Sequence, residues 1–137
     1  MSSGNRIKSY LPETLNLNYK DIKAIKPGAF KDMARLEWLL TLKDNRISSI
    51  DPYTFQGLNK LQELSLAKNK IQILKSNAFV GLHSLKYIDL RGNRITRIEN
   101  GAFAGLDSLV EVRLRGNPVT CDDAHAAGLS QSVYCPD

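Results

Sequence analysis

The sequence predicts an α/β solenoid, a chain coiled into stacked turns that each contribute one short strand to a parallel β-sheet. Asparagines recur every 24 residues, apolar residues keep a constant frame around each asparagine, and a phenylalanine marks the far side of each turn. The asparagines are Asn45, Asn69, Asn93 and Asn117, and the phenylalanines are Phe30, Phe55, Phe79 and Phe103. A fixed period of this length is typical of repeat architectures, in which each turn buries its apolar side chains against its neighbours.

The strands are expected just before the asparagines, in the segments LTLKDNRI, LSLAKNKI, IDLRGNRI and VRLRGNPV. Each segment carries two apolar residues separated by one residue, so both side chains lie on one face of a short strand. A degenerate first turn keeps Leu15 and Leu17 in frame but has Lys20 in place of the asparagine. We therefore expect a sheet of about five parallel strands, with mostly irregular or 3₁₀ structure on the opposite side of each turn.

The asparagine column is expected to be structural. A buried amide costs several kcal/mol unless it is hydrogen-bonded, and its two donors and one acceptor suit it to bridge the backbones of adjacent turns. One turn departs from the frame, because Leu36 and Leu40 are four residues apart where other turns have three. The extra residue predicts a bulge near Trp38, at the entrance to that strand.

Over nearly the whole chain the repeat resembles the leucine-rich repeat family in its extracellular 24-residue form, which occurs in Toll-like receptors and variable lymphocyte receptors. The resemblance implies a curved horseshoe with the parallel sheet on its concave side. It divides the chain into an N-terminal extension or vector-derived remnant (1–10), leucine-rich repeats (11–120) and a short C-terminal cap (121–137). No stretch of 18 apolar residues occurs, so no transmembrane segment is expected.

The resemblance also bears on the two cysteines. The segment from Asn117 through Pro118 to Cys121 resembles the start of a family C-terminal cap, which implies one disulfide between Cys121 and Cys135. The alternative is two reduced thiols in a cytosolic scaffold. No cysteine precedes Leu11, so we expect that the paired-cysteine N-terminal cap common in secreted relatives is absent or was cut away. A weakly capped first strand raises the prospect of a dimer through the N-terminal edge.

Catalytic chemistry has little support in the sequence. Neither His83 nor His125 has a serine or cysteine partner at a motif spacing, and no phosphate-binding glycine loop occurs. Asp122, Asp123 and His125 are explained by a solvated loop, and the two cysteines with distant histidines do not form a metal-ligand set. We predict a protein that is not an enzyme and that has no catalytic residues, metal site or cofactor.

Candidate binding residues are those that flank the buried strand residues and point onto the concave face. The first strands offer Asn16, Leu39, Thr41 and Ser65 among others, whereas the later strands offer aromatic and arginine side chains of the kind enriched at binding hot spots. Arg46, Lys70 and Arg94 follow the asparagines and form a basic rim beside the strands. The predicted ligand-binding residues are Lys43, Glu63, Tyr87, Asp89, Arg91, Glu111, Arg113 and Arg115.

The net charge of +5 and the arginine-rich concave positions favour anionic partners. By analogy with the resembled receptors, the leading hypothesis is a secreted, extracellular recognition protein of innate immunity that binds anionic bacterial surface molecules such as glycolipids. The alternative is an adhesion or matrix module that binds a protein or a sulfated glycan. Nucleic acid is not expected, because Tyr87 alone offers a platform on which bases would stack.

Overall fold

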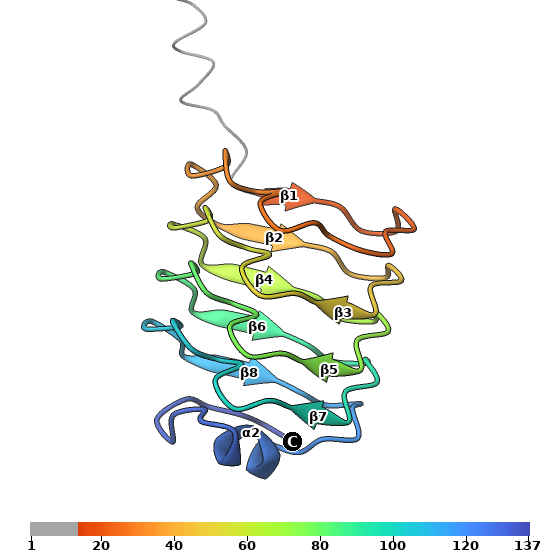
Figure 1. The fold of residues 1–137 in the computed structure, drawn as a ribbon, viewed down its shortest axis with the longest axis vertical. Helices are drawn as coiled ribbons and strands as arrows, with labels where there is room; N and C mark the ends of the chain where they lie inside the picture. The colour runs from red at the N-terminus through yellow and green to blue at the C-terminus, as the bar shows by residue number, and fades with distance from the viewer. Residues whose placement is uncertain (1–13) are drawn as a thin grey trace, which may run out of the picture.

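The computed structural model describes residues 14–137, which coil into a β-solenoid whose turns stack in sequence order (Figure 1). A five-stranded parallel sheet with the order β1-β2-β4-β6-β8 runs the length of the stack. Its strands are β1 (Thr14–Asn16), β2 (Leu39–Thr41), β4 (Glu63–Ser65), β6 (Tyr87–Asp89) and β8 (Glu111–Arg113). The predicted fold class, a solenoid with a parallel sheet of about five strands, is confirmed.

A second parallel sheet, which the sequence analysis did not predict, lies on the opposite side of the turns (Figure 1). Its order is β3-β5-β7, and each strand has two residues: β3 (Ser49–Ile50), β5 (Ile73–Leu74) and β7 (Arg97–Ile98). Two residues are too few to display the alternation that identifies a strand in a sequence. Hydrogen-bonded turns connect the two sheets through the rest of each repeat.

The core lies between the two sheets and consists of columns of equivalent side chains. Leu40, Leu64 and Ile88 face inward from successive strands of the larger sheet and are almost completely buried. The four phenylalanines form a parallel stack, with ring centroids 6.0–6.1 Å apart and interplanar angles of 13–18°. Each stacked aromatic pair contributes about 0.5–1.5 kcal/mol beyond the burial of its area. Every turn therefore depends on its neighbours for burial.

The asparagine side chains join adjacent turns through their backbones. Asn69 is 6% exposed, and its Oδ1 accepts a hydrogen bond from the Ile47 N–H of the preceding turn at 3.1 Å. Its Nδ2 donates to the Leu42 carbonyl of the preceding turn at 3.0 Å and to the Leu66 carbonyl of its own turn at 3.1 Å. The same pattern recurs at the other three asparagines.

This direction of bonding explains the degenerate first turn. Each asparagine serves the turn that precedes it, so the backbone of the first turn is bound by Asn45. The Asn45 Oδ1 accepts from the N–H groups of Lys20 and Ile22 at 2.9 and 3.0 Å. Lys20 can therefore replace the asparagine without leaving the backbone amides of its own turn unpaired.

The extra residue before β2 lies in a bend outside the paired strand. The Gln62 N–H donates to both the Glu37 and Trp38 carbonyls, at 3.1 and 3.3 Å, and the Glu63 N–H donates to the Trp38 carbonyl at 2.8 Å. Leu40 still pairs in register with Leu64. The sheet therefore continues undisturbed, and the insertion leaves Trp38 about half exposed.

The C-terminal cap begins with α2 (Cys121–Ala126), so the solvated loop predicted for Asp122, Asp123 and His125 is wrong. The Thr120 side chain accepts from the Asp123 N–H, and the Asp123 carboxylate accepts from the Thr120 N–H at 2.8 Å. This reciprocal capping box satisfies the first free amides of the helix, a signal that the Thr-Cys-Asp-Asp order carries in the sequence.

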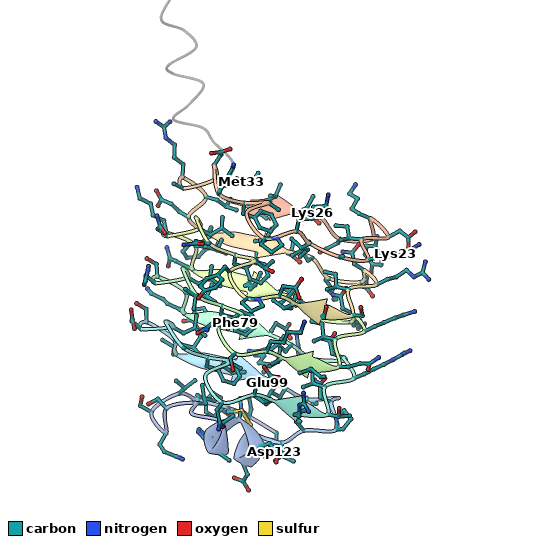
Figure 2. All side chains as sticks on the ribbon, in the orientation of Figure 1. Lys23, Lys26, Met33, Phe79, Glu99 and Asp123 are labelled. Carbon is teal, nitrogen blue, oxygen red and sulfur yellow. A yellow bond between two sulfur atoms is a disulfide. The ribbon has the colours of Figure 1, made fainter. Side chains whose placement is uncertain are left out.

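The predicted disulfide is present between Cys121 and Cys135, beside α2 (Figure 2). It holds the last residues against the sheet, where Tyr134 forms an isolated parallel bridge with Glu111. The Val112 N–H donates to the Tyr134 carbonyl at 2.9 Å, and the Tyr134 N–H donates to the Val110 carbonyl at 2.8 Å. The cap therefore pairs part of the C-terminal edge of the sheet. The predicted extension 1–10 lies outside the described residues, so the N-terminal dimer stays a prediction.

Replacement of Asn69 by alanine should lower the free energy of unfolding by about 1–3 kcal/mol, because the buried Ile47 amide and the Leu42 carbonyl lose their partner. Chemical denaturation followed by circular dichroism measures this change. Asn59→Ala is the control, since Asn59 is exposed, and should change stability by less than about 0.5 kcal/mol. Equal stability of the two variants would contradict a structural role for the asparagine column.

Gly57→Ala should destabilise the protein more than Gly101→Ala. Both glycines have positive φ, +109° and +81°, so both substitutions carry backbone strain. At Gly57 the new Cβ would also lie 2.7 Å from the Lys31 Cα and 2.9 Å from the Phe30 carbonyl oxygen, whereas at Gly101 nothing lies within 4 Å. We expect a difference of about 1–3 kcal/mol in unfolding free energy. Indistinguishable melting temperatures would show that the turns separate easily.

Candidate ligand-binding site on the concave face

The outward face of the five-stranded sheet, the concave face of the horseshoe, contains a groove of about 410 Å³. Alternate residues of each strand point outward, and the strand register aligns them in two rows across β2, β4, β6 and β8. One row is Leu39, Glu63, Tyr87 and Glu111, and the other is Thr41, Ser65, Asp89 and Arg113. The repeat thus builds one continuous surface from residues 24 positions apart.

Five of the eight predicted binding residues line this groove: Glu63, Tyr87, Asp89, Glu111 and Arg113. Arg91, Arg113 and Arg115 line a smaller hollow of about 190 Å³ together with Pro136. Lys43 lines neither.

Beyond the predicted ligand-binding residues, the two hollows are lined by three outward residues that the sequence analysis named but did not select, and by Pro136 of the cap. Alternation along the strands identifies Leu39, Thr41 and Ser65 as outward-facing, although their composition did not mark them as binding residues. Pro136 reaches the smaller hollow only because the cap folds back onto the last turns.

Two of the three arginines are held by a carboxylate two residues earlier in the chain, which lies on β6 for Arg91 and on β8 for Arg113. The Arg91 guanidinium donates to both oxygens of Asp89, at 2.9 and 2.7 Å. Arg113 donates from Nε to the carboxylate of Glu111. Residues two apart in a strand point to the same face, which places these pairs side by side. The cluster of free positive charge expected at the C-terminal concavity is therefore substantially neutralised.

Arg115 differs from the other two. Its Nη2 donates to the main-chain oxygen of Asp137 at 3.3 Å, and none of the ion pairs among residues 14–137 includes it. It is therefore the arginine of this corner whose guanidinium is not held by a carboxylate of the sheet.

The ion pair with Arg91 changes the pKa of the Asp89 carboxyl. Burial raises the pKa of Asp89, but hydrogen bonds from the Arg91 side chain and backbone, with the charges of Arg91 and Arg113, outweigh burial and hold the pKa below its ordinary value of 3.8. The same pair raises the pKa of Arg91, chiefly through its hydrogen bond to Asp89. Asp89 and Arg91 thus remain an ion pair at neutral pH and present a fixed dipole to a ligand.

The middle of the groove has a different chemistry. Tyr87 is 42% exposed and lies between Glu63 and Glu111 in the outward row. Within the described part of the chain, no ion pair involves Glu63. An exposed aromatic ring beside a free carboxylate suits a cationic or amphipathic group, such as a basic side chain of a protein.

The two histidines lie outside the groove. His83 Nδ1 lies 3.4 Å from Asp107 on exposed loops, and His125 Nδ1 lies 3.0 Å from the Leu129 carbonyl in the cap. Among residues 14–137, no group of three or more His, Cys, Asp or Glu side chains is arranged to hold a metal ion. The same span contains no helix with the length and apolar character to cross a bilayer.

Comparison with known proteins decides the family. Residues 39–95 and 69–119 match the family model described as Leucine rich repeat, and together these ranges cover more than half of the chain. The chain belongs to the leucine-rich repeat family. Its fold is typically a non-enzymatic binding scaffold.

The fold is also similar to a solved relative. The crystal structure of a TLR13–ssRNA13 complex aligns with a TM-score of 0.76 and 25% sequence identity over 88% of this leucine-rich repeat chain. The alignment covers only 16% of the TLR13 chain, so the present chain corresponds to a small part of that receptor. No curated protein sequence matches the chain. The similarity to Toll-like receptor ectodomains predicted from the sequence is confirmed.

Arg91→Gln should raise the pKa of Asp89, because burial of the carboxyl remains while its main hydrogen-bond partner is lost. In the native protein the lowered pKa stabilises the fold at all pH values above the unfolded pKa, and this stabilisation is lost as the pH falls through the lower folded pKa. The variant should therefore begin acid unfolding at a higher pH.

An NMR titration of the Asp89 carboxyl carbon measures this pKa directly. Arg97→Gln is the control, since it removes only an exposed pair with Glu99. An Asp89 pKa that is the same in wild type and Arg91→Gln would disprove the ion pair.

Proposed function

We propose that this chain is an extracellular recognition module that binds a macromolecular ligand in the groove of its concave sheet. The observation that carries the proposal is the groove itself, whose walls combine Tyr87, Glu63, Asp89 and the Glu111–Arg113 pair across adjacent strands. Such a mixture of aromatic and charged groups is characteristic of binding hot spots. A catalytic function has less support than a binding function, because the residues that line the groove include no nucleophile paired with a base.

The extracellular part of the proposal rests on the cap. A disulfide between Cys121 and Cys135 closes the C-terminal end of the core, and disulfides persist mainly in oxidising compartments. The similarity to a Toll-like receptor supports the same location. A bridge of this loop length contributes on the order of 3 kcal/mol, so the cap would weaken in a reducing cytosol.

For the ligand, we propose anionic molecules of bacterial surfaces and a role in innate-immune recognition. Lys43 and Arg115 supply positive charge one outward position beyond the two rows, two residues after Thr41 and Arg113, and arginine binds phosphate and carboxylate groups bidentately. The TLR13 structure contains single-stranded RNA, so RNA belongs in the ligand panel although Tyr87 remains the sole aromatic residue lining the groove.

A protein ligand is the second candidate, as in an adhesion or matrix module. It is favoured by the ion pairs of Arg91 and Arg113, because guanidinium groups already held by carboxylates attract a bare polyanion less. Glu63 beside Tyr87 also suits a basic side chain better than a phosphate. A protein ligand would bind with weak dependence on salt.

The test is binding of the purified protein to whole bacteria, lipopolysaccharide, lipoteichoic acid and single-stranded RNA at physiological salt. The groove variant combines Tyr87→Ala with Arg115→Glu, which leaves both ion pairs intact. The control combines Tyr53→Ala with Lys60→Glu, an exposed tyrosine and lysine outside the groove with the same change of composition and charge. We expect the groove variant to bind bacterial molecules at least about tenfold more weakly and the control to bind normally.

Equal binding by the two variants would place the site outside the groove. Binding to RNA alone would replace bacterial glycolipids as the ligand class, and no binding to the panel would favour a protein partner. Affinity capture from extracellular fluid with wild type and groove variant then identifies that partner.

A further inference from the structure

The positive charge of the chain is concentrated in the segments around the asparagine positions, which run along one lateral edge of the solenoid and the adjoining concave face. Five six-residue segments, each running from two residues before the asparagine position to three after it, contain nine Lys and Arg residues and two Asp residues. These segments are 18–23, 43–48, 67–72, 91–96 and 115–120. Their net charge is +7, whereas the whole chain carries +5, so all other residues together carry a net −2.

Six of these cations point away from the groove and form what we call the basic strip. In Figure 2, side chains that end in nitrogen project from the edge of the stack on which Lys23 is labelled. None of the six lines either concave hollow. The basic strip consists of Lys20, Lys23, Arg46, Lys68, Lys70 and Arg94.

Backbone hydrogen bonds hold the strip in a regular array. The N–H of Arg46 donates to the Ile22 carbonyl of the turn before it at 2.8 Å. Lys70 and Arg94 repeat this bond at 2.8 and 2.9 Å, and the Lys68 N–H donates to the Arg91 carbonyl of the next turn at 2.8 Å. The backbones that carry neighbouring cations of the column are therefore about one strand spacing, roughly 4.8 Å, apart. A rigid array loses little backbone entropy when it binds a ligand.

Little negative charge opposes the strip. Asp21 pairs with Arg46 at 3.2 Å, and Asp44 is half-buried, while the third and fourth segments contain no acid. Lys70 and Arg94 take part in no ion pair among residues 14–137. Beside the cations runs a column of exposed neutral residues, Ser48, Gln72 and Thr96, joined by backbone hydrogen bonds of 3.3 and 2.9 Å. Hydroxyl and amide groups of this kind bind sugar hydroxyls.

We propose that the basic strip binds a linear sulfated polysaccharide laid along the solenoid axis, at a surface separate from the groove. A linear polyanion matches a column of cations one turn apart, and the neutral column matches its hydroxyl groups. A single-stranded nucleic acid fits less well because Tyr19, at one end, is the one large exposed aromatic of these segments. A glycolipid fits less well because the strip offers no apolar surface for acyl chains.

The test measures binding of size-defined heparin oligosaccharides by calorimetry between 50 and 300 mM salt. The strip variant combines Lys23→Gln, Lys70→Gln and Arg94→Gln. The control combines Lys31→Gln, Lys60→Gln and Lys86→Gln, which removes three exposed lysines from other parts of the turns and lowers the net charge equally. Desulfated heparin, lipopolysaccharide and single-stranded RNA serve as comparison ligands.

We expect the strip variant to bind heparin at least about tenfold more weakly at 150 mM salt. The slope of its affinity against salt concentration should correspond to about two to three fewer released counterions. The control and the groove variant should bind heparin as the wild type does. The strip variant should bind any ligand of the groove with wild-type affinity. Three results would overturn the proposal: equal loss in strip and control variants, binding that does not require sulfate, or tighter binding of RNA or lipopolysaccharide to the strip. Since the groove and strip variants are separate, the failure of one proposal leaves the other standing.

Discussion

The structure depends on the bonding of buried asparagine amides between neighbouring turns. Where the chain leaves each strand of the larger sheet, its backbone N–H and C=O groups no longer pair with the neighbouring strand. These groups are also buried away from water. Asn93 shows the solution: its Oδ1 accepts from Ile71 at 3.1 Å, and its Nδ2 donates to Leu66 and Leu90 at 2.9 and 3.0 Å. One side chain thus satisfies three backbone groups on two turns, and without it each bend would bury unpaired polar atoms.

This arrangement has a functional consequence, because it makes every turn a copy in space of the previous one. The Leu and Phe columns are buried by neighbours, while the outward positions are free to vary as long as they remain compatible with water. Variation across the strands builds the groove around Tyr87, and variation beside the asparagines builds the basic strip. Two surfaces of different charge therefore arise on one scaffold without disturbing its core.

Charge counted along the sequence and charge available to a ligand are different quantities in this protein. Arg91 and Arg113 appear in the sequence as part of a basic cluster, but the pleat of the strand places each against an acid two residues earlier. In the basic strip the spacing differs, because the residues two positions before Lys70 and Arg94 are a lysine and a glycine, not acids. Unpaired positive charge is therefore greater along the basic strip than in the groove, whose lining includes Glu63, Asp89 and Glu111.

The sequence by itself determined the solenoid, its period, the five strands, and which side chains of each strand face the core or the groove. Each of these features depends on local spacing that is repeated every 24 residues. Only the tertiary structure decided which charges pair, that Pro136 closes the C-terminal hollow and that two-residue strands form a second sheet. It also decided that the insertion at Trp38 leaves the register intact and that Asp123 caps a helix. The physical reason is that these features depend on distances between atoms of different turns, or on cooperative choices of segments too short to show a period.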